Sequence, residues 1–507
     1  MIALIIIAAV PALFLLWVLT TYVEHVISLR KYPKGPFPLP LIGNLNLIGG
    51  QRIHLNLLEL TKKYGNVYSI SMGMRRVVVV NSYENVKEGL VTRGHDLAGR
   101  PHLRVGSKYH SNNYKTVGAM DYSKSWAFVR KLAYKSLHLY GEGMVNMESC
   151  VLENVEKLSG IISKEVGQPV LIHQYLGNIL VNTICTRVFN TDYEIDDPEF
   201  QNILDFTFDI GKGLGLDGWT MIFPWLANLP ANTSEELRHL IAAVKNRNAH
   251  TRKKFEEHIA TFNPEKLRDI CDQLLFLSQN KEQWEGAGFE KVTQEQLEAI
   301  VHSYFFAGIE TTLTTLRWFF LYCLYHPEYE TKMYQELVDT FGLKHRLTYG
   351  DLSSLPFTQA MMNETNRCAS ILRINLPHKA EVDSSIGGKA IPKGTPVIFN
   401  FHSVHFDGKY WENPNEFNPH RWLNTDGSLK KEKVTHYLPF SAGTRVCLGE
   451  KMAKVQMFLI AASLVRSFEV MRYDGEKLPA LDERGPGSGP YTPGTTYKVI
   501  FKKRSEA

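Results

Sequence analysis

The most chemically suggestive stretch of the sequence is PFSAGTRVCLG, residues 439–449, in which Cys447 lies between two glycines and two residues after Arg445. A buried structural cysteine packs as a small hydrophobe and needs no such setting. A thiolate, in contrast, acts as a nucleophile or a metal ligand, and nearby positive charge or a helix N-terminus favours the ionised form. The helix-like run that follows would supply such an N-terminus. The residues alone leave ligand, nucleophile and structural thiol open.

A second unusual segment is AGIETT, Ala307 to Thr312, inside a long apolar run. Glycine and threonine are weak helix formers, and threonine hydroxyls can bond a preceding carbonyl and bend a helix. Gly308 would let another group approach the backbone closely. Glu310 places an ionisable group where burial is expensive. A kinked core helix and a functional groove both explain this segment.

Two further patterns carry less chemistry by themselves. Glu364 and Arg367 are three residues apart and therefore share one face of a predicted helix, where a buried structural pair is the simplest interpretation. The segment GKGLGLDG, residues 211–218, resembles a dinucleotide-binding loop, but Leu216 occupies the third glycine position and no strand precedes it. We therefore reject a nucleotide site there.

These residues must be positioned by a mainly helical body. A helix is predicted from about Thr293 to Pro327, because Thr293 and Gln296 have capping-box spacing and the proline stops the run. It would be roughly 48 Å long and is too apolar for the surface, so we expect it to cross the centre of the fold. Residues 147–164 and 232–259 also favour helix.

A smaller β-rich part completes the body. The β-branched runs around GMRR predict a hairpin over residues 67–82, and short strand-like pieces separated by Gly and Pro follow residue 376. The expected fold class is mainly α with a smaller β-rich region.

The N-terminal segment differs in composition from the rest of the chain. Residues 2–23 contain no charged side chain and are long enough to cross a bilayer, although a buried core helix is the alternative. We predict a membrane anchor over residues 1–30, with basic residues after it marking the cytosolic side. Four prolines within residues 31–44 predict a stiff hinge, and residues 45–507 would form one catalytic domain.

Composition narrows the function classes. The 507 residues are 44% hydrophobic, which allows a large core, and the net charge of +5 gives no support to nucleic-acid binding. Six cysteines are scattered without any CxxC, which favours a reducing compartment over a disulfide scaffold.

Taken together and in this order, four motifs resemble those of the cytochrome P450 superfamily, the haem-thiolate monooxygenases, and the resemblance covers essentially the whole chain. The matching positions are Trp126 and Arg130, then Ala307, Gly308, Glu310 and Thr311, then Glu364 and Arg367, and last Phe440, Gly443, Arg445, Cys447 and Gly449. One element departs from the family, because His420 in Pro419–Trp422 replaces an acid, while Arg421 remains.

The resemblance implies a triangular, mostly helical prism that binds haem b, with Cys447 as the axial thiolate. It implies that the haem propionates pair with Arg445, Trp126, Arg130 and His378, and that Gly443 and Gly449 leave room for the porphyrin. Phe440, Ala307 and Gly308 would also adjoin the haem. Thr311 and Glu310 would guide protons to dioxygen, and Glu364, Arg367 and Arg421 would have a structural role.

The implied reaction inserts one atom of O2 into a lipophilic, steroid-like substrate. Electrons would come from NADPH through a separate NADPH–cytochrome reductase, with cytochrome b5 as a second partner, because the chain has no flavin or nicotinamide motif. A basic face that includes Lys451 and Lys454 would dock the reductase. The implied location is the endoplasmic reticulum membrane, in contact with membrane lipid, with the catalytic domain on the cytosolic face.

The substrate is predicted from residues 121–137 and 223–230, which resemble the animal steroid- and aryl-hydrocarbon-oxidising group of the family. Residues 198–235 are expected to form a lid. The pocket residues expected from the lid and the central helix are Phe206, Phe208, Trp219, Phe305 and Ile309. A broad xenobiotic or fatty-acid oxidase, a peroxide-rearranging enzyme and a haem-thiolate sensor without turnover remain as alternatives.

Overall fold

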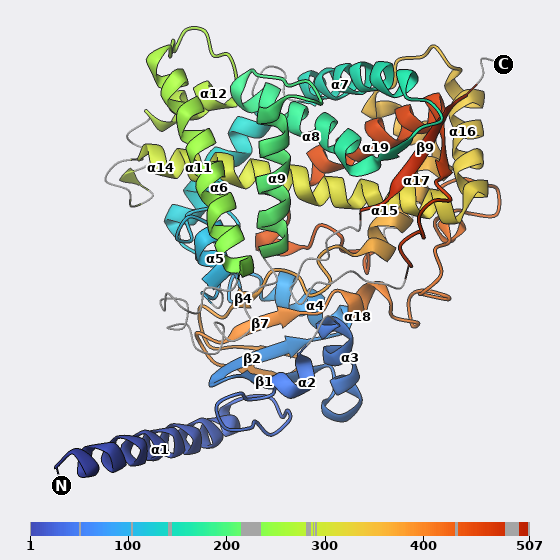
Figure 1. Cartoon of the computed structure of the whole chain (residues 1–507). Helices are drawn as coiled ribbons and strands as arrows, with labels where there is room; N and C mark the ends of the chain where they lie inside the picture. Colours follow the sequence, from blue (N-terminus) through green and yellow to red (C-terminus); the bar gives the residue numbers. More distant parts are fainter. Residues whose placement is uncertain are drawn as a thin grey trace.

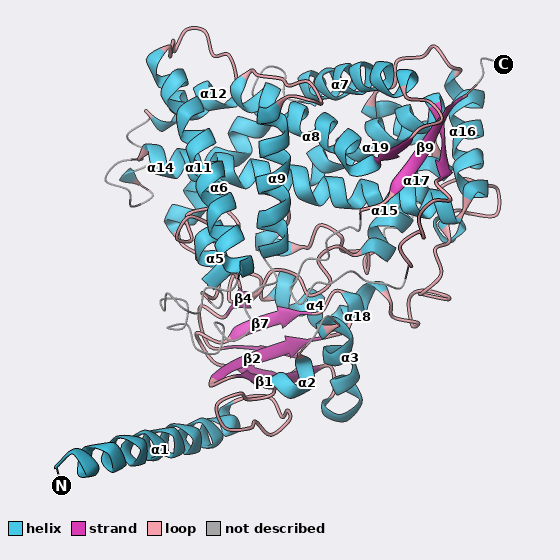
Figure 2. Cartoon of the chain, in the orientation of Figure 1, coloured by secondary structure: helices cyan, strands magenta, loops and turns pink. Residues whose placement is uncertain are grey.

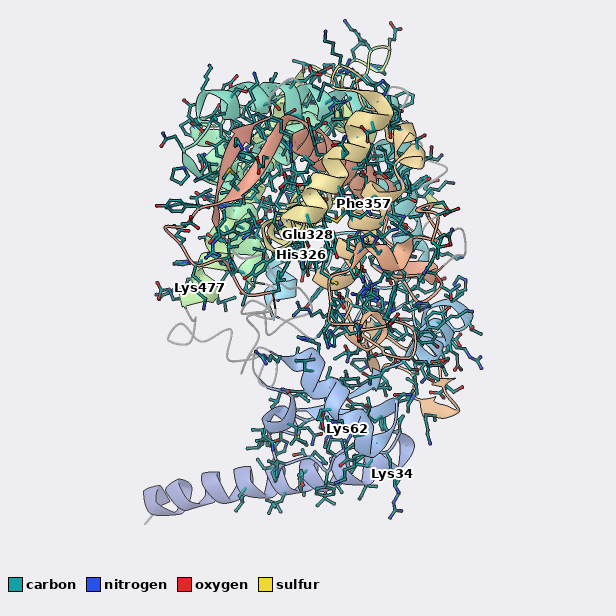
Figure 3. All side chains as sticks on the ribbon, turned by 90° about the vertical axis from the view of Figure 1, so that its right-hand side faces the viewer. Lys34, Lys62, His326, Glu328, Phe357 and Lys477 are labelled. Carbon is teal, nitrogen blue, oxygen red and sulfur yellow. The ribbon has the colours of Figure 1, made fainter. Side chains whose placement is uncertain are left out.

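The computed structural model describes most of the chain and is mainly helical (Figure 2). The described residues are 2–49, 52–102, 105–139, 144–213, 235–279, 285–286, 288, 292–430, 434–481 and 496–504. Side chains fill the helical body, and the N-terminal helix extends away from it (Figure 3). The predicted fold class, mainly α with a smaller β-rich part, is confirmed.

The projecting N-terminal helix is α1 (Ile2–Ser28), which lies at the edge of the molecule below the first sheet (Figure 1). Many of its large apolar side chains are exposed, namely Leu13, Leu15, Leu16, Trp17, Leu19, Val23 and Ile27. Within the described residues, no helix is both long enough and apolar enough to span a bilayer. The membrane-spanning segment within residues 1–30 therefore stays a prediction.

The larger sheet contains the predicted hairpin. Strands β1 (Val67–Met72) and β2 (Arg75–Val80) pair antiparallel, and Gly73 makes the turn with a φ of 62°. Strand β7 (Pro396–Phe399) joins β2 in parallel, and β4 (His378–Lys379) pairs with β7. The order β1-β2-β7-β4 places His378 at the sheet edge that adjoins the helical body (Figure 1).

The long central helix crosses the body as predicted, but it is interrupted in the middle (Figure 1). Its parts are α14 (Gln294–Phe305), a π-helical turn η5 (Phe306–Glu310) and α15 (Thr311–Tyr325). The expected capping box is present, since the Thr293 N–H donates to Gln296 Oε1 at 2.7 Å. The π turn coincides with the AGIETT segment, and such turns are frequent at functional sites.

Helices on all sides bury the central helix. Helices α8 and α9 contact the π turn, α11 contacts α14, and α17 and α19 contact α15. Their bounds are α6 (Lys124–Leu139), α7 (Met144–Lys164), α8 (Ile172–Phe189), α9 (Pro198–Gly213), α11 (Glu235–Ala260), α12 (Ile270–Ser278), α16 (Pro327–Phe341), α17 (Pro356–Ala369) and α19 (Glu450–Ser467). The two helices predicted from residues 147–164 and 232–259 are thus confirmed within the described part of the chain.

The other strands and helices are mostly short. The remaining strands are β3 (Pro169–Leu171), β5 (Ser384–Ile386), β6 (Lys389–Ile391), β8 (Phe468–Arg472) and β9 (Lys498–Lys503), in sheets ordered β3-β9-β8 and β5-β6. The remaining short helices are η1 (Leu29–Lys31), α2 (Leu45–Ile48), α3 (Ile53–Tyr64), α4 (Tyr83–Lys87), η2 (Glu88–Thr92), α5 (Val105–His110), η6 (Tyr349–Ser354), α18 (His402–His405), η7 (Pro419–Trp422) and η8 (Gly443–Arg445).

Candidate functional site

The cysteine loop is held by its own backbone directly before a helix. The N–H of Cys447 donates to the Phe440 carbonyl at 2.9 Å, and the Val446 N–H donates to the Gly443 carbonyl at 3.1 Å. Helix α19 then begins at Glu450, three residues after the cysteine. The loop therefore fixes the thiol in front of a helix N-terminus, as the sequence predicts.

Gly443 lies too close to a neighbouring backbone to carry a side chain. Its φ is +70°, and a Cβ built there would lie 1.7 Å from the carbonyl oxygen of Leu90. The close neighbour that excludes a side chain is thus the backbone of η2, and the expected room for a porphyrin at Gly443 stays a prediction. A Cβ at Gly449 would meet no heavy atom of the described residues within 4 Å, so this glycine does border open space.

The Cys447 side chain faces a space inside the protein. It is exposed, whereas the other five cysteines are buried. Burial nevertheless raises the pKa of its thiol, and this outweighs the opposing effects of the Gly449 N–H and the Arg130 charge. A side chain that is both accessible and desolvated lies in an interior hollow rather than in bulk water.

Two arginines and a tryptophan predicted from the family motifs lie beside the cysteine loop. The Arg445 guanidinium lies 4.0 Å from the Trp126 ring centroid, and Arg445 Nε donates to the Ala98 carbonyl at 2.8 Å. Arg130 Nη2 donates to the Val446 carbonyl at 2.6 Å, one residue before the cysteine. The motifs therefore meet in space although they lie about 320 residues apart in the chain.

Arg100 belongs to the same cluster and was not predicted. It is 8% exposed, and its Nη1 donates to the Pro377 carbonyl at 2.9 Å. Burial, followed by repulsion from Arg445 and Arg130, lowers its pKa to about 9. No motif marks this arginine in the sequence, and only its burial beside other cations reveals it.

The carboxylates of Asp121 and Glu381 offset only part of the charge of the three arginines, because both also pair with Lys379. Arg445 Nη1 and His378 Nε2 are buried and have no hydrogen-bond partner among the described residues. The nearby carboxylate of Asp121 is already paired with Lys379. Buried guanidinium groups favour bidentate carboxylate partners. A dianionic group beside the thiol, as the two propionates of haem would be, therefore fits these residues.

Around the π turn, one face of the central helix is accessible to solvent. Ala307 is exposed, and Gly308 and Thr311 are half-buried, although the adjoining parts of the helix are buried. The Thr311 hydroxyl donates to the Ala307 carbonyl, one turn earlier. The side chains that the family motif assigns to oxygen chemistry thus border an interior space.

Glu310 lies on the neighbouring face, against α9. It is 1% exposed, and the Thr314 hydroxyl donates to its Oε1 at 3.4 Å. A Cβ built on Gly211 would lie 3.4 Å from its Cγ, so this glycine lets α9 approach the carboxylate. Gly211 therefore belongs to a helix contact, and residues 214–218 of the pattern lie outside the described residues.

At Gly308, the central helix approaches α19, the helix that follows the cysteine loop. A Cβ built there would lie 3.1 Å from Ile184 Cδ1 and 3.4 Å from Met452 Cε. Met452 is on α19, directly after the cysteine loop. This contact brings the π turn and Cys447 to the same region.

Glu364 is the centre of a buried ionic network. Arg367 lies 2.8 Å from it with both side chains fully buried, and Arg421 Nε lies 2.9 Å from Glu364 Oε1. Although burial raises the pKa of Glu364, hydrogen bonds and charge from Arg367 and Arg421 lower it overall. The predicted structural pair is confirmed as buried, and His420 does not remove Arg421 from the network.

Four of the five predicted pocket residues lie among the described residues. Phe305 packs near Phe189 with ring centroids 5.9 Å apart, and Ile309 is fully buried in the same helical core. Phe206 lies 6.3 Å from the His250 ring, and Phe208 lies beneath the Lys212 ammonium. Phe305 and Ile309 are buried in the helical core, and their assignment to the pocket lining stays a prediction. Trp219 lies outside the described residues.

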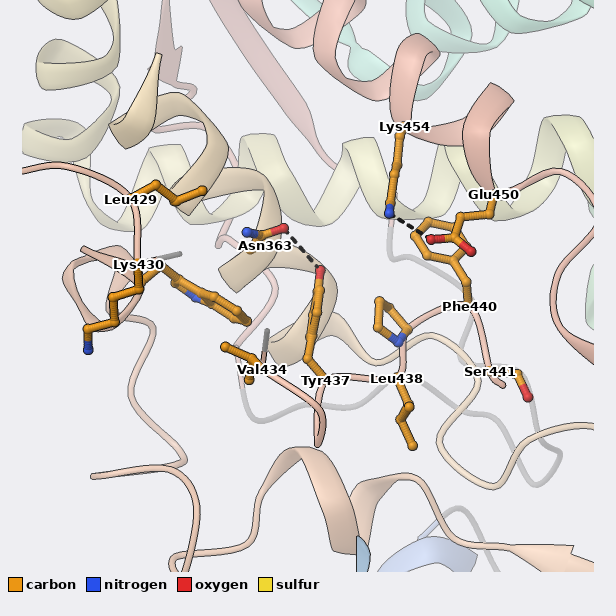
Figure 4. A pocket seen from close by; sticks show the side chains of 12 residues that line it. Asn363, Leu429, Lys430, Val434, Tyr437, Leu438, Phe440, Ser441, Glu450 and Lys454 are labelled. Atoms are coloured by element: carbon orange, nitrogen blue, oxygen red, sulfur yellow. Dashed lines mark hydrogen bonds and ion pairs between the residues drawn. The ribbon is translucent and has the colours of Figure 1, made fainter. Parts of the chain in front are cut away.

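A separate cavity of about 270 Å³ lies on the cysteine side, between α17, η7, residues 434–441 and the start of α19 (Figure 4). Lys454 pairs there with Glu450 at 2.6 Å and lies 5.4 Å from the Phe440 ring. Neither Cys447 nor Thr311 lines this cavity. It is a feature of the protein surface next to the site and not the reaction space.

Comparison with known proteins agrees with this geometry. Residues 33–500 match the family model described as cytochrome P450. A steroid 17-alpha-hydroxylase/17,20 lyase of Ictalurus punctatus is 35% identical over 479 residues, which are 94% of this chain and 91% of that protein. The proteins of the same name from Gallus gallus and Squalus acanthias are 35% identical over 453 residues and 33% identical over 474 residues. These alignments cover 89% and 93% of this chain, and 88% and 92% of those proteins.

Proposed function

This chain belongs to the cytochrome P450 family and is a monooxygenase, and on that premise we propose that it oxidises a steroid-like lipophile. One observation carries the proposal: the accessible, desolvated Cys447 thiol lies beside a buried arginine cluster in which Arg445 Nη1 has no hydrogen-bond partner among the described residues. A thiolate-bound, dicarboxylate cofactor satisfies both features. The printed names of the relatives support the choice of a steroid.

Haem b is the cofactor that the family implies. Haem held by a cysteine thiolate supplies electron density that favours O–O cleavage. Cys447 would hold its iron, while Arg100, Arg130 and Arg445 would neutralise its carboxylates. His378 Nδ1 donates to the Leu97 carbonyl, so its Nε2 would pair with a carboxylate only when that nitrogen is protonated. The Trp126 ring fixes the Arg445 guanidinium at 4.0 Å, which preorganises that cation.

We assign proton handling to the accessible face of the π turn. A threonine hydroxyl both donates and accepts, so Thr311 can hold a water in the groove while it donates to the Ala307 carbonyl. Glu310 lies beside it and is buried against α9. A carboxyl group in that position can exchange a proton with such a water.

Electrons would come from NADPH through a separate reductase, with cytochrome b5 as a second donor. Lys451 is exposed at the start of α19, close to the cysteine loop, and supports an acidic partner surface on this side. Lys454 contributes less to such a surface, because Glu450 already pairs with it.

Reconstitution tests this function directly. The purified protein, a microsomal reductase, NADPH and a panel of steroids, fatty acids and planar aromatics should give oxygenated product from the steroids, dependent on NADPH and O2. Incorporation of one labelled oxygen atom from O2 would identify a monooxygenase product. Turnover confined to peroxides, without NADPH, would contradict the proposal, and preferred turnover of fatty acids would contradict the steroid assignment.

We further propose that residues 1–30 hold the catalytic body on the cytosolic face of the endoplasmic reticulum. The exposed apolar side chains of α1 support this, because such a surface is unfavourable in water. Deletion of residues 1–30 should shift the protein from the membrane pellet toward the supernatant. An unchanged pellet fraction after this deletion would contradict the anchor.

A further inference from the structure

Three side chains that can ligate a metal ion meet where α11 ends and α12 begins. One ligand atom each of His258, Asp269 and Cys271 lies within 4.8 Å of the other two. His258 comes from α11, Asp269 is the N-cap of α12, and Cys271 lies in the first turn of α12. All three side chains are buried. Among the residues that the structure describes, no other three histidine, cysteine or acidic side chains come together in this way.

Outer hydrogen bonds orient the histidine and the aspartate. His258 Nδ1 donates to the Lys254 carbonyl at 2.7 Å, and Nε2 faces Asp269 Oδ2 at 2.6 Å. The other oxygen, Asp269 Oδ1, accepts the N–H of Asp272 at 2.9 Å and so caps α12. Histidines that bind a metal usually donate their second ring N–H to a carbonyl or a carboxylate, which fixes the direction of the ligating nitrogen. One ring nitrogen and one carboxylate oxygen are therefore held ready for an ion.

The distances between these atoms suit zinc after a small adjustment. Zinc bonds of about 2.0–2.2 Å to nitrogen and oxygen and about 2.3 Å to sulfur place tetrahedral ligand atoms roughly 3.4–3.6 Å apart. The His258–Asp269 separation of 2.6 Å is shorter than this, and the three atoms lie within 4.8 Å of one another. An ion would part the ring and the carboxylate by about 1 Å and draw the thiol inward.

The charges balance when zinc replaces two protons. With Asp269 ionised, the two hydrogen bonds of His258 require a proton on both ring nitrogens, and the three groups sum to zero with a neutral thiol. Zn²⁺ with a neutral imidazole, a carboxylate and a thiolate also sums to zero, so two protons leave as the ion binds. Arg268 does not oppose the ion, because Asp272 accepts its Nε at 2.7 Å and its Nη2 at 2.8 Å.

We propose that His258, Asp269 and Cys271 bind one Zn²⁺ ion, with water as the fourth ligand. The thiolate and the imidazole select zinc over Mg²⁺ and Ca²⁺, which prefer oxygen ligands. The exposed residues 263–266 of the connecting loop provide the path of entry. Helix α12 lies at the end of the body remote from β1 and β2 and contacts α6 and α8 (Figure 1). The ion therefore fastens α12 to α11, in a structural role that is independent of the proposed oxidation.

Metal analysis of the haem-loaded, untagged protein tests the site. After one molar equivalent of zinc and gel filtration, the parent should contain one zinc per haem iron. X-ray absorption at the zinc edge should show one sulfur ligand at about 2.3 Å. His258→Gln keeps a donor for the Lys254 carbonyl, and Cys271→Ser keeps the size of the side chain. Each should weaken zinc binding at least roughly 100-fold in competition with a chelating dye, because losing an outer-shell partner alone costs about 10–100-fold.

Matched controls separate this site from adventitious binding. His239 is an exposed histidine 3.9 Å from Glu235, and Cys150 is a buried cysteine of α7. His239→Gln and Cys150→Ser should therefore leave the ratio of zinc to iron unchanged. The reduced carbon monoxide spectrum of each variant shows whether fold and haem are retained.

A parent protein without stoichiometric zinc, or zinc bound without a sulfur ligand, would overturn the proposal. Full zinc content in both His258→Gln and Cys271→Ser would do the same. His258 and Asp269 would then form a simple ion pair, and the monooxygenase assignment would stand, because NADPH-dependent product formation is measured independently.

Discussion

The cysteine loop and the π turn of the central helix are built in different ways. On the cysteine side, backbone hydrogen bonds and a glycine with no room for a Cβ fix the loop, and guanidinium groups are locked on carbonyls and on a tryptophan ring. At the π turn, in contrast, Ala307 is exposed and Thr311 is half-buried, and the Thr311 hydroxyl donates to the Ala307 carbonyl. The first region is fixed by many contacts and suits a bound cofactor, and the second leaves a hydroxyl accessible for proton handling. The cofactor site thus depends on backbone geometry, whereas proton handling depends on a few side chains.

The largest expected effect comes from the ionic network that supports the cysteine side. Glu364→Ala leaves the buried Arg367 without its counter-charge, and breaking a buried pair costs about 3–5 kcal/mol. Urea unfolding should show this loss together with a reduced haem content. Glu59→Ala removes an exposed partner of Lys62 and should cost less than about 1 kcal/mol. Equal losses in the two variants would contradict the supporting role of the network.

The cationic cluster should control retention of the cofactor. Arg445→Leu removes donors aimed at the haem carboxylates, and hydrogen bonds to charged groups are worth about 1.5–3 kcal/mol, so haem should dissociate roughly tenfold to a hundredfold faster. Transfer of haem to apomyoglobin measures this rate. The same variant loaded with haem whose carboxylates are esterified should differ little from the unmodified protein. A difference just as large with esterified haem would show that Arg445 acts only on the fold.

At the π turn, Thr311→Ala should change the yield of product per NADPH more than it changes substrate affinity. The variant loses the hydroxyl that organises water in the groove, so NADPH oxidation should continue while product per NADPH falls several-fold and hydrogen peroxide rises. Thr311→Ser retains a hydroxyl and should recover much of the coupling. If Thr311→Ala couples NADPH to product as well as the parent, proton handling belongs to other groups.

The smallest effect is the contribution of Glu364 to the pH dependence of stability. Its pKa is lowered in the folded protein from an ordinary value of 4.5. A lowered carboxyl pKa stabilises the fold above the unfolded-state value, and this contribution is lost as pH falls through the folded-state value. The free energy of unfolding should therefore fall more steeply below about pH 4.5 in the parent than in Glu364→Gln. Parallel curves for the two proteins would remove Glu364 as the cause.

Much of the cysteine side was predictable, because local patterns determine it. The spacing around Cys447, the Glu364–Arg367 pair and the Thr293 capping box each act within a few residues, and each appears in the structure as expected. The strand pairing of β1 and β2 follows for the same reason.

The π turn, the role of Arg100 and the packing of the central helix depend on tertiary contacts, which short sequence patterns do not predict. The π turn arises where α9 and α8 approach the central helix closely, and Arg100 gains its role only through burial beside other arginines. Phe305 and Ile309 are apolar and could equally line a pocket or fill a core, and the sequence does not show that they are buried in the region where α8 contacts the central helix.

The most direct test of the account is the absorbance spectrum of the reduced carbon monoxide complex, because it reports the atom that holds the iron. The parent protein should show the red-shifted Soret band of thiolate-bound haem, and Cys447→His should bind haem without it. Replacing the other five cysteines with alanine, one at a time, should leave the band in place. Persistence of the band in Cys447→His would contradict the assignment of Cys447, and its absence from the fully loaded parent would contradict the haem-thiolate site as a whole.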